Sequence, residues 1–204
     1  MDHRSTKQKI LDAALDLFST QGFEATSVSQ IADKVGIRKA SMYSHFASKQ
    51  DILEKLMQDV MEQYKWHSFF SETNWEQSSF FAEDKDLSVD SVIQMIVGQI
   101  RYILHEPQVA KARKMLTIEQ FRNPTLAKVQ TKQNYTDVMR FFTGLVEFLI
   151  EKKKLSDHGA DIMAAQLCLP VSVWLNLCDR EPEREDKVVD LIERHVRQFF
   201  TMYN

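Results

Sequence analysis

The chain has 204 residues, of which 44% are hydrophobic, and it contains only five glycines and four prolines. That length is enough to bury a substantial core, and the scarcity of turn-forming residues favours a helical protein. The formal net charge of −3 argues against general binding to polyanions, so any affinity for DNA must come from a local basic surface.

The first predicted helix begins at Ser5 and ends at Gly22. One apolar face recurs at helical spacing, made of Ile10, Ala14, Leu17 and Phe18. Gly22 is typical of a helix stop, and Phe23 beyond it can fold back onto the helix. The polar start of the chain resembles no signal peptide.

Residues 26–49, with the sequence TSVSQIADKVGIRKASMYSHFASK, have the spacing of a helix-turn-helix. Ala32 is small enough to let two helices cross closely, and Gly36 suits a turn position with positive φ. The second of these helices is predicted over about residues 38–46. The shared core of the pair is expected to contain Ile31, Val35, Ile37 and Met42.

This second helix and its flanks are basic. From Lys34 to Lys49 there are four Lys or Arg residues and no Asp or Glu. Such a helix suits the major groove of DNA, where cations and hydroxyls reach phosphates and base edges. We expect base contacts from Arg38, Lys39 and Ser41. We expect phosphate contacts from Tyr43, His45 and Lys49.

Two hydroxyl residues, Thr26 and Ser27, open the preceding helix. A hydroxyl there caps free amides, binds a phosphate at the positive helix end, or does both. An alternative reading of the whole segment also stays open. Helix-turn-helix geometry occurs in helical proteins that never touch DNA, and a basic surface is often only solvated.

Across the first quarter of the chain, many positions agree in register with the pattern of a known family. They are Ile10, Ala13, Ala14, Leu17, Phe18, Gly22, Phe23, Thr26, Ser27, Ile31, Ala32, Gly36, Ile37, Lys39, Ser41, Met42, Tyr43, Phe46, Ser48, Lys49, Ile52 and Leu53. In these residues the chain resembles the DNA-binding domain of the tetracycline-repressor (TetR/AcrR) family of transcription regulators.

The resemblance implies a helix-turn-helix DNA-binding domain over residues 1–50 and an effector-binding and dimerisation domain over residues 51–204. It also implies a phosphate contact by Ser27 or its neighbour. Two positions depart from the family pattern. Arg38 stands where a small hydroxyl residue usually caps the recognition helix, and Ala40 stands where glycine is frequent. Since Arg38 cannot cap, we expect it to reach DNA, and the family's operator preferences do not transfer.

Further helices are predicted over residues 48–70, 88–105, 108–121 and 124–154, then from Ser156 or Asp157, and finally from the acidic stretch 181–186 onward. Residues 72–87 are polar and acidic, and we expect a mobile loop there. Its aromatic residues, Trp75, Phe80 and Phe81, either cap a pocket or pin the loop to the core, and we favour pinning. The expected fold is therefore all-α with about nine helices.

The segment 162–178 has seventeen residues without a charge, which is the bottom of the membrane-spanning range. Gln166 and Asn176 interrupt it and Pro170 is expected to kink it, so we interpret it as a helix buried between subunits. Two copies of this helix and the last one would form a four-helix interface about a twofold axis, as the resemblance also implies. The expected interface residues are Val171, Trp174, Leu175, Val188, Ile192, Val196 and Phe199. The alternative is that the last helix packs only on its own chain.

The resemblance further implies a small-molecule cavity among the helices that follow the helix-turn-helix. The expected lining is Trp66, Phe70, Tyr102, Met115, Phe121, Phe142 and Trp174. Aromatic and methionine side chains with few charges suggest an apolar or aromatic effector. The alternative is that each of these residues is ordinary core.

These expectations describe a cytoplasmic homodimer that binds a palindromic double-stranded DNA operator and responds to a small molecule, most simply as a repressor. A helical partner-binding protein of the same fold without DNA binding is the alternative. An enzyme is disfavoured because the six histidines are scattered and no HExxH, GxSxG or glycine-rich phosphate loop is present. We expect no catalytic residue, metal site, cofactor or membrane partner, and we expect Cys168 and Cys178 to be buried free thiols.

Overall fold

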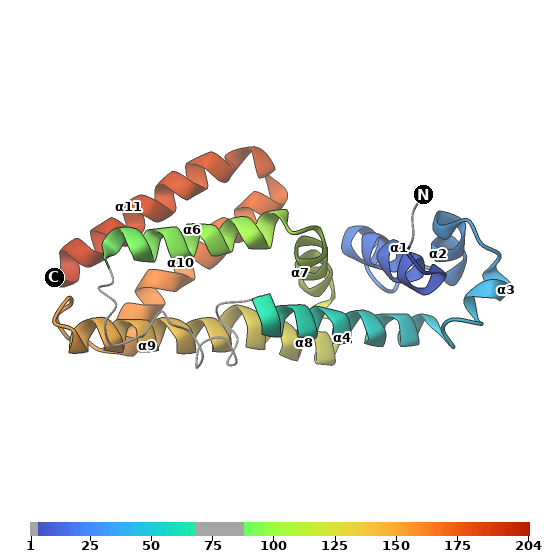
Figure 1. The fold of residues 1–204 in the computed structure, drawn as a ribbon, viewed down its shortest axis with the longest axis horizontal. Coiled ribbons are helices and arrows are strands. Elements are labelled where there is room, and N and C mark those ends of the chain that lie inside the picture. Colours follow the sequence, from blue (N-terminus) through green and yellow to red (C-terminus); the bar gives the residue numbers. More distant parts are fainter. Residues whose placement is uncertain (1–3, 68–87) are drawn as a thin grey trace. The chain divides into compact units, whose positions relative to one another are not determined.

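The computed structural model describes residues 4–67 and 88–204, and for residues 64–67 it describes the backbone alone. Every regular element in these described parts is a helix, which confirms the all-α prediction (Figure 1). The helices are α1 (Thr6–Gln21), α2 (Val28–Val35), α3 (Lys39–Met42), α4 (Lys49–His67), α6 (Val89–His105), α7 (Pro107–Glu119), α8 (Pro124–Thr131), α9 (Asp137–Glu151), α10 (Ala160–Arg180) and α11 (Glu185–Tyr203), with a π-helix, η2 (Lys132–Thr136), and a 3-10 helix, η3 (Pro182–Arg184). The expected pinned loop, with Trp75, Phe80 and Phe81, lies outside the described residues.

The helix limits follow local chemistry. At the start of α1, the Ser5 side chain accepts a hydrogen bond from the Gln8 amide at 3.2 Å. At its end, Gly22 has φ of 88° and its amide donates to the Phe18 carbonyl at 3.1 Å. Both are the signals that the sequence indicated, a hydroxyl cap and a glycine stop.

The chain divides into two compact units, residues 1–64 with 107–130 and residues 65–106 with 131–204. In the first unit α1 packs against α2 and α7, and α2 packs against α3. Its core includes residues from α7 and α8, namely Ala112, Met115, Leu116 and Leu126, beside Phe18, Ile31 and Met42. The compact unit around the helix-turn-helix is thus larger than residues 1–50, whose functional boundary stays a prediction.

In the second unit, α10 packs against α9, α6 and α11, and α11 also packs against α6 (Figure 1). By length and composition α10 could cross a membrane, and it is the one helix of this kind among the described residues. Its face that includes Met163, Leu167 and Val171 is buried against the other helices of this unit. That is how a core helix of a folded domain behaves. From the sequence we expected this helix to be buried between subunits, whereas this face is buried within its own chain.

The single helix expected over 124–154 is present from Pro124 to Glu151, but five residues within it are wound as a π-helix. Asp137 is the first residue after this π-helix, and its carboxylate is fully buried. Lys132 Nζ lies 2.7 Å and Arg140 NH1 lies 3.3 Å from Asp137 Oδ1. These cations compensate the buried charge, which would otherwise be costly.

Candidate nucleic-acid interface

The start of α2 is closed by a reciprocal cap. Ser27 Oγ accepts a hydrogen bond from the Gln30 amide at 3.2 Å, and Gln30 Oε1 accepts one from the Ser27 amide at 2.7 Å. This capping box satisfies two of the amides that a helix start leaves unpaired. Ser27 itself is exposed, so capping does not remove it from contact with a ligand.

The turn between α2 and α3 depends on Gly36. Its φ of 79° and ψ of 32° are left-handed, and its amide donates to the Ala32 carbonyl at 2.9 Å. No atom lies within 4 Å of the position that a Cβ would take. Glycine is therefore needed here for its backbone conformation rather than for space.

The recognition helix is shorter than expected. Instead of covering residues 38–46, α3 has four residues, and a turn follows in which the Met42 carbonyl accepts from the amides of His45 and Phe46. Arg38 precedes α3 and makes no side-chain cap, as expected from its lack of an acceptor. Because Arg38 cannot cap the first amides of α3, the helix start lacks a stabilising hydrogen bond, which is consistent with a short helix.

In α3 and the turn after it, the large apolar side chains are buried and the charged and polar side chains are exposed. Met42 and Phe46 are almost completely buried in the core of the first unit. Arg38, Lys39, Ser41 and His45 are exposed, and Tyr43 is 52% exposed. In the described part of the chain, Arg38 and Lys39 have no ion-pair partner, so their charges are available to a ligand.

Two predicted DNA-binding residues are occupied within the fold. Lys49 Nζ donates to the carbonyls of Phe23 at 2.6 Å and Thr26 at 2.8 Å. Thr26 is 1% exposed, and its hydroxyl donates to the Gly22 carbonyl at 2.7 Å. Both side chains thus point inward and brace the segment between α1 and α2. This corrects the expectation that they face phosphate, because backbone carbonyls of residues 22, 23 and 26, in the segment between α1 and α2, accept these donors.

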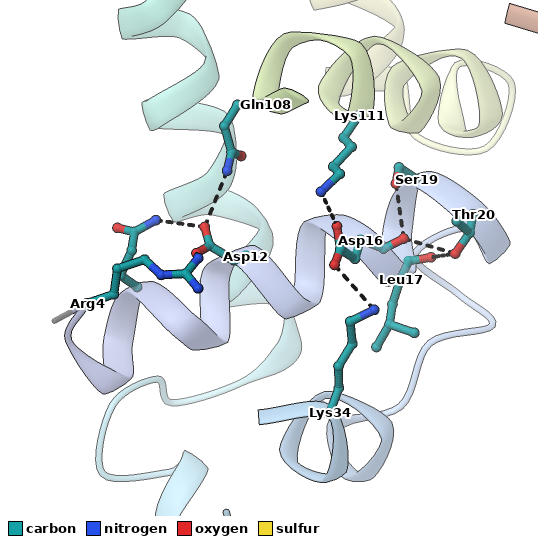
Figure 2. Close-up of polar contacts among 10 residues, drawn as sticks. Arg4, Asp12, Asp16, Leu17, Ser19, Thr20, Lys34, Gln108 and Lys111 are labelled. Atoms are coloured by element: carbon teal, nitrogen blue, oxygen red, sulfur yellow. Dashed lines mark hydrogen bonds and ion pairs between the residues drawn. The ribbon is translucent and has the colours of Figure 1, made fainter. Parts of the chain in front are cut away.

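The first unit is further held by carboxylates on α1 (Figure 2). Asp16 lies 3.2 Å from Lys34 Nζ of α2 and 2.5 Å from Lys111 Nζ of α7. Burial raises the pKa of Asp16, but hydrogen bonds and charges from Lys111 and Lys34 outweigh it, so the pKa is lowered from its ordinary value. The α1 helix therefore carries an ionic link to both neighbours.

The predicted effector residues are divided between the two units. Met115 is fully buried in the core of the first unit, and Phe121, in the same unit, is 91% exposed. Tyr102, Phe142 and Trp174 belong to the second unit, where Phe142 is part of the buried core. The rings of Trp174 and His195 meet edge to face, with their centroids 5.4 Å apart. Phe70 and the side chain of Trp66 lie outside the described residues. A cavity of about 550 Å³ in the second unit is lined by Ser88, Val89, Lys154, Arg197, Phe200, Thr201 and Asn204. None of the five predicted residues whose side chains the structure describes is among them.

The residues expected at a dimer interface are mostly core within one chain. Val171, Leu175, Val188, Ile192, Val196 and Phe199 are all buried in the second unit, and only Trp174 is partly exposed. This corrects their assignment, because the stripe of α11 packs against α6 and α10 of the same chain. On α10 the exposed apolar residues are instead Ile162, at 58%, and Val173, at 64%.

No group of three His, Cys, Asp or Glu residues that could hold a metal ion occurs in the described parts. Cys168 and Cys178 are buried free thiols, as predicted. Burial raises the pKa of Cys168 to about 12. A thiol of this kind remains protonated and unreactive near neutral pH.

Sequence reasoning did not identify Glu119, whose carboxylate accepts a hydrogen bond from the Phe23 amide at 2.8 Å. The two residues are 96 positions apart. A backbone donor carries no sequence signal, so no pattern in the chain could have paired them.

Comparison with known proteins extends these findings. The family described as "Bacterial regulatory proteins, tetR family" matches residues 10–56. The biofilm operon icaADBC HTH-type negative transcriptional regulator IcaR of Staphylococcus aureus is 49% identical over 49 residues, which cover 24% of this chain and 26% of that protein. IcaR of Staphylococcus epidermidis is 36% identical over 118 residues, which cover 55% and 58%. The chain thus matches about a quarter to somewhat over half of the length of these relatives.

The complete fold also has counterparts among solved structures. A complex of SmeT with triclosan has a TM-score of 0.67 at 17% identity and covers 98% of this chain and 92% of that one. This similarity concerns the fold. The chain has the all-helical architecture in which an N-terminal helix-turn-helix is followed by a larger set of helices. The N-terminal part of the chain, residues 10–56, thus resembles the TetR family of bacterial regulatory proteins.

Proposed function

We propose that the chain is a transcriptional repressor that binds double-stranded DNA through α3, the turn after it and the N-terminus of α2. The observation that carries this proposal is the division of side chains in this segment. Apolar Met42 and Phe46 are buried, while cations, hydroxyls and an imidazole are exposed over the same few residues. Two curated relatives are named negative transcriptional regulators, which supports repression.

The exposed residues take different roles in this proposal. Arg38, Lys39 and Ser41 are assigned to base edges, because cations and hydroxyls at the start of a recognition helix reach the floor of the major groove. Tyr43, His45 and Ser27 are assigned to phosphates, which fix register and orientation. Thr26 and Lys49 support the segment from within.

A homodimer doubles the contact surface and reads a palindromic operator. The exposed Ile162 and Val173 on α10 are the proposed centre of the interface, in place of the buried stripe on α11. Charged residues are absent from 162–178, so this helix can be covered without burying an ion. Function in the cytoplasm follows from a role at DNA.

An apolar or aromatic effector is proposed to bind in the region after residue 50 and to release the operator. A solved structure of the same fold is a complex with triclosan, an aromatic compound, and another is described as SmeT, the repressor of the Stenotrophomonas maltophilia multidrug efflux pump SmeDEF. Of the predicted contacts, Tyr102 and Trp174 are partly exposed, and both are kept in this proposal. Trp66 and Phe70 stay predictions.

A mobility-shift assay with duplex DNA from the region upstream of the chain's own gene tests the proposal. The protein is expected to shift a discrete fragment at a concentration that leaves unrelated DNA free. If every duplex is bound with equal affinity, or none is bound, the regulator is ruled out in favour of a partner-binding protein of the same fold.

A further inference from the structure

The backbone of Phe23, in the segment that joins α1 to α2, is held from both sides. Its amide donates to Glu119 Oε1 of α7 at 2.8 Å, and its carbonyl accepts from Lys49 Nζ of α4 at 2.6 Å. Glu119 is 2% exposed and Phe23 is 9% exposed, so the pairing with Glu119 is shielded from water. A shielded hydrogen bond to a carboxylate is among the stronger ones a protein makes.

Gly22, the residue before Phe23, leaves room for the Glu119 carboxylate because it has no side chain. Gly22 has φ of 88°, a conformation that side chains rarely adopt. A Cβ at this position would lie 2.9 Å from Glu119 Oε1 and 3.2 Å from Ile118 Cγ2. Glycine is therefore required both for its conformation and for the close approach of α7.

The same segment leads directly to the proposed DNA surface. Thr26 closes it, since its amide donates to the Phe23 carbonyl at 3.2 Å and its hydroxyl donates to the Gly22 carbonyl at 2.7 Å. Ser27, the exposed cap of α2, is the next residue. The position of Ser27 is therefore set by how the Phe23 backbone is held.

We propose that Glu119 is a positioning residue for DNA binding: its carboxylate fixes the segment from Gly22 to Thr26 and so orients Ser27 and the first turn of α2 toward the phosphate backbone. This inference rests on the proposed DNA binding. Glu119 does not touch DNA. It raises the fraction of molecules whose α2 is already in the binding orientation.

Two substitutions separate the carboxylate's hydrogen bond from its bulk. Glu119→Ala leaves the Phe23 amide buried without an acceptor, and we expect operator affinity to fall about tenfold or more. Glu119→Gln keeps an amide oxygen at the same reach, and we expect affinity within about threefold of the unsubstituted chain. Leu116→Ala is the control, because Leu116 is 1% exposed on the same helix and its truncation lowers stability without removing a bond to the segment.

The experiment uses the full chain and the upstream duplex that it shifts. Operator affinity is measured by fluorescence anisotropy, stability by urea unfolding, and the opening of the Phe23 amide by hydrogen exchange. The inference predicts faster exchange at Phe23 and weaker DNA binding in Glu119→Ala, recovery of both in Glu119→Gln, and little loss of affinity in Leu116→Ala at temperatures where it is folded.

Two results overturn the positioning role alone: unchanged operator affinity in Glu119→Ala while the unsubstituted chain binds, or losses in Glu119→Ala and Leu116→Ala that simply follow their losses of stability. Absence of DNA binding by the unsubstituted chain would instead defeat the proposed function, and the positioning role with it. The exchange measurement needs no DNA, so it shows separately whether the hydrogen bond at Phe23 is present.

Discussion

In the first unit Lys111 Nζ lies 2.5 Å from Asp16 Oδ1, which joins α7 to α1 by an ion pair (Figure 2). Lys34 of α2 approaches the other carboxylate oxygen at 3.2 Å. One carboxylate therefore links three helices, including the one that opens at Ser27. The pairing is partly exposed, so it adds modestly to stability and chiefly restricts how these helices can shift.

Asp16→Asn should lower the free energy of unfolding near neutral pH by about 1 kcal/mol or less, because the exposed pairs are screened by solvent. The folded-state pKa of Asp16 is lowered from 3.8, so its contribution is present above that pH and is lost as pH falls through the folded value. Urea unfolding of both proteins across acidic pH checks this. The gap between them should close in acid, and a gap that widens there would contradict the assignment.

Asp190→Asn is the matched control for that experiment. Asp190 pairs with Arg194 at 2.9 Å, but both side chains are more than 60% exposed, at 63% and 66%. The change should alter stability by less than about 0.5 kcal/mol at any pH.

Gly36→Ala should destabilise the first unit by about 1–2 kcal/mol, since a left-handed residue with a Cβ pays this conformational cost. No atom would clash with the new side chain, so Gly36→Asn should cost distinctly less, because asparagine tolerates this conformation better. Thermal unfolding of the two variants gives the comparison. A loss in Gly36→Asn as large as that in Gly36→Ala would contradict the claim that the left-handed backbone conformation selects glycine here.

Asp137→Ala should destabilise the second unit by about 2 kcal/mol, because it removes the partner of Lys132 and Arg140 beside the π-helix. Lys132→Ala should cost less, since its side chain is 44% exposed and Arg140 still reaches the buried carboxylate. Urea unfolding at neutral pH ranks the two. A larger loss in Lys132→Ala would mean that the carboxylate is not the centre of this cluster.

Val173→Glu should break the proposed dimer, because a carboxylate on the exposed apolar face of α10 would have to be buried in it. Light scattering after size exclusion should report a dimer for the unsubstituted chain and a folded monomer for the variant. Gln94→Glu, an exposed change on α6 of the same unit, is expected to remain dimeric. A variant Val173→Glu that stays dimeric places the interface elsewhere.

Much of the fold was predictable because its signals are local. The Ser5 cap, the glycine stops at Gly22 and Gly36, and the inward Met42 each depend on residues within one or two turns. Helical spacing of apolar residues was also sufficient to place most helices.

What the sequence did not predict depends on partners far along the chain. The stripe of Val188, Ile192 and Val196 showed that one face of α11 is buried, but not that its own α6 and α10 cover it. The charge of Lys49 suggested phosphate, although backbone carbonyls from residues 23 and 26 receive it. Glu119 gave no signal because its partner is an amide, which every residue but proline carries.

The salt dependence of DNA binding tests the central claim most directly. Fluorescence anisotropy over a range of salt concentrations should give a steep slope for the unsubstituted chain, and Lys39→Ala or Tyr43→Ala should weaken binding about tenfold or more. Lys114→Ala, an exposed lysine on α7 outside the proposed interface, should bind nearly as the unsubstituted chain does. If Lys39→Ala and Tyr43→Ala bind the operator as tightly as Lys114→Ala at every salt concentration, the surface of α3 does not read DNA.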